Sequence, residues 1–202
     1  MLIAQAKRKE NIAEYILYLW QLEDLLRALC FDPDAIWRTL VETHDTDPAT
    51  RQEMLLWYME LVNLLREEGK AESGHLRHTM HLVEDLQGLH NRLMALPGGA
   101  GGAGSARATG AAVAGYRAAF ARLSPELPTL RTILGRNDAG EIELCFRALY
   151  SVVLYRVKSQ AKGEAQPRAA IAGVLELVSP VVATLVAIYH KIERGEMDLE
   201  LD

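Results

Sequence analysis

Four of the six histidines of the chain lie in the segment 72–96, where they could hold a metal ion. The sequence Glu72-x-x-His75 matches one half of the pattern by which helical bundles bind two metal ions. On a helix, His75 and His78 would share a face, because three residues turn through about 300°. No other histidine follows a glutamate at this spacing, so the pattern is incomplete. We therefore expect no metal and no cofactor, with His75 and His78 as the remaining candidate ligands and His90 as a hydrogen-bonded residue at the edge of the core.

A second chemical feature is a carboxylate in an apolar helical sector. At about 100° per residue, Glu23 falls among the apolar residues of the segment 11–30. A charge there requires a partner, because the burial of an isolated ion is prohibitive. Arg27 lies one turn further on, and Arg156 falls among the apolar residues of the segment 141–160. We expect Glu23 to meet Arg27 or Arg156 in the interior, either as a structural ion pair or as the polar floor of a ligand site.

Sequence patterns of well-known catalytic sites do not occur. The chain has no GxSxG elbow, no GK[ST] phosphate loop and no HExxH motif. The glycines at 98–104 follow a predicted helix and are interspersed with alanine, which is typical of a linker. Cys30 and Cys145 form no CxxC pattern and predict neither a zinc site nor a disulfide framework. The lack of a disulfide pattern is typical of a reducing compartment. The chain also starts without the apolar run of a signal peptide, and we therefore predict a location in the cytoplasm.

The charge balance excludes one large class of function. The 202 residues include 22 Lys and Arg against 27 Asp and Glu, a formal net charge of −5. Nucleic-acid binders usually carry a clustered basic excess, so we expect no nucleic-acid partner. Half of the residues are hydrophobic but 6% are aromatic, a balance that favours a helical protein rich in leucine and alanine. A chain of this length can bury its own core, and we predict a single domain over residues 1–202.

Apolar residues recur at helical spacing along most of the chain and predict an all-α fold. The Asp-Pro pair at 32–33 ends the first helix, whereas the pair at 47–48 begins another, because aspartate caps free N–H groups and proline fits the first turn. The prediction is a single-domain bundle of about six or seven helices. We expect helices over 11–30, 34–43, 48–68, 72–96, 111–123, 141–160 and 168–193, and a short helical piece after 124.

The stretch PGGAGGAGSARATG at 97–110 divides the predicted helices into two halves. It holds six glycines and no large apolar side chain, which predicts a flexible, Gly/Ala-rich surface loop. Neither half is large enough to be comfortable as an independent domain. We interpret the stretch as an internal loop of one domain.

The most apolar window, residues 171–189, is long enough to span a membrane. Glu176 and Pro180 lie near its middle, however, and a carboxylate at the centre of a bilayer costs roughly 2.5–3.5 kcal/mol. We therefore expect a core helix or a dimer interface and no membrane contact. One domain of this size has little helix surface to cover both this window and the apolar segment 11–30, which predicts a homodimer.

Three segments carry a resemblance to a known family. They are KRKENIAEYILYLWQLEDLLRA at 7–28, GHLRHTMHLVEDLQGLHNRL at 74–93 and NDAGEIELCFRALYSVVLYRVK at 137–158. The chain resembles an uncharacterised bacterial family of short, cytoplasmic helical proteins, classed as a domain of unknown function. The resemblance spans nearly the whole chain and implies an all-α fold and a bacterial source. It implies no activity and no functional residues.

These observations leave two hypotheses about function. The first is a non-catalytic cytoplasmic interaction or scaffold module, homodimeric and with a protein as its possible partner. The alternative is a helical-bundle enzyme, or a binder of a small ligand or metal, with Glu23, Arg27 and Arg156 as its polar floor and His75 and His78 at its rim. An enzyme requires titratable groups that converge on a pocket, whereas an interaction module requires an exposed apolar surface.

Overall fold

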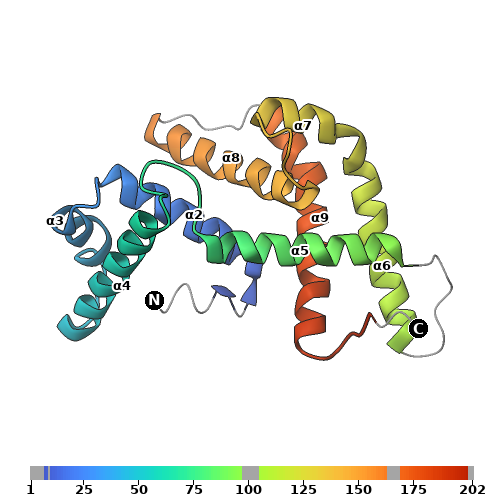
Figure 1. Ribbon diagram of the computed structural model, residues 1–202, viewed down its shortest axis with the longest axis horizontal. Coiled ribbons are helices and arrows are strands. Elements are labelled where there is room, and N and C mark those ends of the chain that lie inside the picture. The colour runs from blue at the N-terminus through green and yellow to red at the C-terminus, as the bar shows by residue number, and fades with distance from the viewer. Residues whose placement is uncertain (1–6, 9, 97–104, 163–168, 200–202) are drawn as a thin grey trace. The chain divides into compact units, whose positions relative to one another are not determined.

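A computed structural model of the chain describes residues 7, 8, 10–96, 105–162 and 169–199 (Figure 1). Within these ranges the regular structure is helical and no strand occurs, so the predicted all-α helical fold is confirmed. Contacts between residues divide the chain into two compact units, Met1–His81 and Leu82–Asp202, which we call unit 1 and unit 2. The single domain over residues 1–202 stays a prediction.

Capping side chains fix the starts of the first three described helices. These helices are α2 (Ile12–Ala28), the short α3 (Pro33–Ile36) and α4 (Pro48–Glu67). The side-chain oxygens of Asn11, Asp32 and Asp47 accept hydrogen bonds from backbone N–H groups of the first turns. Proline occupies the first turn of α3 and of α4. A backbone N–H group there would have no acceptor within the helix, so proline, which lacks this group, breaks no hydrogen bond. The Asp-Pro pair at 47–48 begins a helix as predicted, and the pair at 32–33 also begins one.

The segment expected as one helix over 34–43 has two parts. The helix α3 gives way to a π-helical turn, η1 (Trp37–Val41), closed by a 2.9 Å hydrogen bond from the N–H of Glu42 to the carbonyl of Trp37. A π-helical turn holds more residues than an α-helical turn, so the side chains of residues five apart point towards the same face of the helix more closely than they do in an α-helix. The wider turn lets Ile36 and Val41 both lie fully buried in the core of unit 1.

The core of unit 1 draws mainly on α2, η1 and α4. Among the described residues of unit 1, Trp20 of α2 is the largest fully buried side chain. The helix α5 (Arg77–Ala95) begins later than predicted, because residues 69–76 form a loop in which Gly69 and Gly74 have positive φ angles. A cluster of buried residues forms the core: Leu19, Leu22, Leu26, Ile36, Val41, Tyr58, Leu61, Val62, Leu65 and Leu76.

Unit 2 holds the larger part of α5 and the helices that follow it. These are α6 (Ser105–Leu123), the 3-10 turn η2 (Ser124–Glu126), α7 (Leu127–Leu134), α8 (Glu141–Lys162) and α9 (Ala169–Glu193). The helix α9 packs against α6 and α8, and α7 packs against α8 (Figure 1). At the end of α7, Gly135 has a φ of 62° and caps the helix in the left-handed conformation. The helix α9 continues through Pro180.

The Gly/Ala-rich stretch at 97–110 differs from the prediction in its second part. Residues 97–104 lie outside the described residues, so a loop there stays a prediction. Residues 105–110 already belong to α6, and the loop predicted for them is wrong. This segment contains Ala106, Arg107 and Ala108, which are good helix formers, and the helix therefore begins before the predicted position.

Candidate functional site

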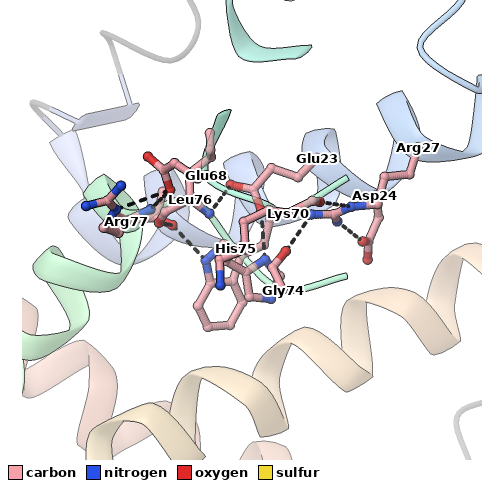
Figure 2. A network of polar contacts seen from close by, with 11 residues as sticks. Glu23, Asp24, Arg27, Glu68, Lys70, Gly74, His75, Leu76 and Arg77 are labelled. Atoms are coloured by element: carbon pink, nitrogen blue, oxygen red, sulfur yellow. Dashed lines mark hydrogen bonds and ion pairs between the residues drawn. The ribbon is translucent and has the colours of Figure 1, made fainter. Parts of the chain in front are cut away.

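Glu23 projects from α2 into the core of unit 1, where 1% of its surface is exposed. Its Oε1 accepts a hydrogen bond from the backbone N–H of Leu76 at 3.3 Å, and its Oε2 lies 2.8 Å from Nδ1 of His75 (Figure 2). Because a carboxylate only accepts hydrogen bonds, Nδ1 of His75 is the donor. Two donors from one short segment therefore satisfy the buried carboxylate.

These donors stand at the beginning of α5. Leu76 directly precedes Arg77, and the backbone N–H of Arg77 donates to Oε2 of Glu68 at 2.7 Å (Figure 2). The first N–H groups of a helix have no partner within the helix, and the positive end of the helix dipole favours negative charge. Glu23 of α2 and Glu68 next to α4 therefore cap α5 from outside. This capping explains why a glutamate occupies an apolar sector of α2.

His75 is held between Glu23 and an aromatic ring. Its imidazole stacks on Trp20, with the ring centroids 3.9 Å apart and the planes 7° from parallel. The indole Nε1–H of Trp20 donates to Oγ1 of Thr79 at 3.2 Å, and the hydroxyl of Thr79 donates to the carbonyl of Leu76 at 2.8 Å. The polar groups of this region form one connected, buried network around the start of α5.

Arg27 fixes the loop that precedes α5. Its guanidinium donates to the backbone carbonyls of Lys70 and Gly74, and its Nη1 lies 2.6 Å from the carboxylate of Asp24 (Figure 2). Gly74 has a φ of 88°, and a Cβ there would lie 3.2 Å from Cδ of Lys70. Glycine lets the loop turn at this close approach, and Arg27 positions it through backbone contacts.

The expected partner Arg27 is not the one that Glu23 meets within unit 1, and a pairing of Glu23 with Arg156 stays a prediction. Glu23 is buried, but its donors are His75 and the backbone of Leu76, which a loop brings to it. Helical spacing cannot reveal a partner that lies on a loop. Arg156 is exposed on α8.

The residues considered as metal ligands do not form the expected half-motif. Glu72 and His75 lie in the loop before α5, so the helical Glu-x-x-His spacing does not apply to them. Nδ1 of His75 is engaged with Glu23, and His78 is exposed on α5. Among the residues that the structure describes, no group of three or more His, Cys, Asp or Glu side chains could hold a metal ion.

A second buried network lies in unit 2 around His90, which is 3% exposed rather than at the edge of the core. Its Nε2 lies 2.7 Å from Oε2 of Glu141, and its Nδ1 lies 2.6 Å from the hydroxyl of Tyr116. The carboxylate requires a donor, so Nε2 carries the proton and Nδ1 of the neutral ring accepts from Tyr116. Burial lowers the pKa of His90, although Glu141 acts in the opposite direction. The network joins α5, α6 and α8.

The thiol of Cys145 and the hydroxyl of Tyr116, two groups of unit 2, are unreactive. Burial, with a smaller contribution from Glu141, raises the pKa of the Cys145 thiol to about 12. Burial also raises the pKa of the Tyr116 hydroxyl above its usual range. Both groups stay protonated at neutral pH, and a protonated thiol is a poor nucleophile. Cys145 therefore serves as a small core residue of α8.

An apolar groove lies between α7 and the beginning of α9, with a cavity volume of about 210 Å³. At its edge Ile133 is 73% exposed, whereas Leu130 and Val178 are buried. A Cβ added at Gly173 would meet no atom within 4 Å, so the groove is open at this position. Sequence analysis missed the groove, because it arises from the packing of two helices. It is lined by Leu123, Glu126, Thr129, Leu130, Ile133, Gly173, Val174, Leu177 and Val178.

The helix α9 also carries an apolar stretch that is partly uncovered. Gly173–Glu193 is long and apolar enough to cross a membrane, with a mean hydropathy of 1.6 in its most apolar window. Only 39% of that window is buried. Glu176, Pro180, Ala183 and Ala187 are exposed on it at helical spacing, so the outer face carries small side chains and one carboxylate.

Comparison with known proteins identifies the family of the chain. Residues 1–196 match the family described as Domain of unknown function (DUF4924). The chain belongs to this family. No curated protein and no solved structure gives a significant match. Membership in the DUF4924 family agrees with the resemblance carried by the three sequence segments, and the bacterial source stays a prediction.

Removal of the Glu23 carboxylate should destabilise the protein. In Glu23→Ala the buried N–H groups of His75 and Leu76 lose their acceptor, and we expect the free energy of unfolding to fall by about 3 kcal/mol. Urea unfolding followed by circular dichroism measures the loss. The control is Asp24→Ala, which removes a partly exposed carboxylate and should cost less than about 1 kcal/mol. Equal losses in the two variants would contradict the capping by Glu23.

The His90 network should make stability depend on pH. Burial depresses the pKa of His90 in the folded protein below the ordinary value of 6.5. Its contribution to stability is therefore fully present above the unfolded pKa and is lost as the pH falls through the folded pKa. Between about pH 7.5 and about pH 5, the urea midpoint should fall less in His90→Gln than in the wild type. The exposed residue His81 provides the control variant His81→Gln, and parallel pH profiles for His90→Gln and the wild type would refute this contribution.

Proposed function

We propose that this DUF4924 protein is a non-catalytic helical interaction module, whose partner inserts apolar side chains into the groove between α7 and α9. The groove carries the proposal. Its volume of about 210 Å³ lies below the roughly 300–1,000 Å³ of pockets that enclose small molecules. A shallow cavity with an exposed isoleucine at its edge suits the side chains of a protein partner.

The buried polar networks support a structural role for the residues of the alternative hypothesis. In the described part of the chain, every buried side-chain nitrogen or oxygen has a hydrogen-bond partner. Glu23 and Arg27 are engaged with the loop and the start of α5. Of the described residues that line the groove, Glu126 is the titratable one. An enzyme would instead bring several titratable groups together at its pocket.

The partly covered helix α9 supports a second element of the proposal, a homodimer. The helix packs on α6 and α8, and its outer face carries Pro180, Ala183 and Ala187. These small side chains allow a second helix to approach closely, and a two-fold axis would place the same face of a second copy against them. Glu176 lies within the same apolar stretch and opposes insertion into a bilayer.

We place this module in the cytoplasm. Cys30 and Cys145 are free thiols, and one of them is exposed. Disulfides form and persist in oxidising compartments, so an exposed free thiol fits a reducing one. Fractionation of cells of the source organism tests this location, and recovery outside the cytoplasm would overturn it.

The homodimer predicts a defined result in native mass spectrometry. The wild type should give twice the chain mass, and Ala183→Arg should shift the protein towards the monomer, because a bulky cation cannot enter a close helix contact. Leu56→Arg changes an exposed residue of α4 and should leave the dimer intact. A monomeric wild type, or flotation of the wild type with liposomes through α9, would contradict the proposed dimer.

The interaction function predicts that the groove binds an apolar helix face. The probe is a fluorescent designed helical peptide with leucines on one face and glutamines elsewhere. Gly173→Ala should bind it like the wild type, whereas Gly173→Phe should weaken binding at least about tenfold by filling the open space beside Gly173. Ile133→Glu should weaken binding as well, and Leu56→Glu serves as the matched exposed control. Unchanged anisotropy titrations for Gly173→Phe would overturn the proposed function.

A further inference from the structure

We propose that the partner of the groove is an amphipathic helix with a lysine or arginine beside its apolar face, and that Glu126 pairs with this cation. The inference rests on the function proposed above. The apolar walls of the groove and the charge at its edge indicate which chemistry the partner has.

The walls of the groove have the spacing of a helix-binding surface. On α9 the lining residues Gly173 and Leu177 are four positions apart, and on α7 Leu130 and Ile133 are three apart. Two neighbouring helices leave a channel between their ridges, and this channel receives side chains that recur every three or four residues. Each wall extends over roughly one to one and a half helical turns, about 6–8 Å. Apolar residues at positions i and i+4 of a partner helix match this length.

Other modes of peptide recognition lack the surface that they need. An added strand pairs with the edge of a sheet, and the residues described in ranges 10–96, 105–162 and 169–199 contain no strand. A proline-rich segment docks into a groove lined by aromatic rings, and none of the described lining residues is aromatic. A helix is therefore the partner element that this groove fits.

The charge at the groove is negative. Glu126 is the charged residue among the described lining residues, and it is exposed. Arg131 of α7 donates to backbone carbonyls of the turn that follows this helix. Arg122, Arg136 and Glu176 are also exposed in unit 2, but none of the three lines the groove. With a net charge of −5 for the whole chain, the groove favours a basic helix and repels an acidic one.

Two peptides test the charge of the partner. Both carry the leucine face of the probe described above, and they differ only in lysine or glutamate at the flanking positions. At low ionic strength the lysine peptide should bind the wild type about tenfold more tightly than the glutamate peptide, and salt should narrow the difference. Glu126→Lys should reverse the preference. The control Glu67→Lys, at an exposed position of α4, changes the net charge equally and should keep the preference for lysine.

The outcomes separate this inference from the function on which it rests. If both peptides bind alike and Gly173→Phe still weakens them, the groove is a binding site and the pairing with Glu126 is wrong. If Glu67→Lys reverses the preference as Glu126→Lys does, the net charge selects the partner and the pairing is again overturned. If Gly173→Phe weakens neither peptide, the proposed function itself fails. Selective loss of the lysine preference in Glu126→Lys supports the pairing.

Discussion

The start of α5 imposes the strongest constraint on unit 1, because the backbone N–H groups of Leu76 and Arg77 have no acceptor within the helix and require one from another element. Glu23 and Glu68 supply these acceptors from two other elements. The price of burying a carboxylate is offset by a backbone N–H, an imidazole N–H and the positive end of a helix. One side chain thereby ties α2, the loop before α5 and α5 itself together. Arg27 completes the arrangement by holding the carbonyls of that loop.

The two units use polar groups in the same way. In unit 2, His90 links α5, α6 and α8 through Tyr116 and Glu141, as His75 links the start of α5 to α2 in unit 1. A buried, connected network favours one arrangement of the helices over its competitors, since a shifted register would leave polar groups unpaired. The polar groups of both networks hydrogen-bond to one another inside the units. The surface instead offers apolar features, the groove beside α7 and the outer face of α9, and these features support a function in binding.

The sequence predicts those features of the fold that depend on local patterns. Helical periodicity and Asp-Pro capping locate the helices, and the apolar sector of α2 shows that Glu23 must be paired. The identity of its partner depends on the turn at Gly74, which brings His75 back to α2, and no spacing rule encodes that turn. The same turn explains why α5 begins later than the sequence pattern predicts. Arg156 illustrates a further limit: it falls in the apolar sector of α8 and is nevertheless exposed, because a helical wheel gives the direction of a side chain and not its burial. The groove is set by packing alone.

The contrast between the two cysteines gives the molecule an internal reporter. Cys30 is exposed at the end of α2, whereas Cys145 is buried with its pKa raised to about 12. A thiol reagent therefore modifies the native protein at Cys30 and reaches Cys145 only in molecules whose helices in unit 2 have separated. The rate of modification at Cys145 then measures the opening equilibrium of unit 2, without an engineered label and independently of unit 1.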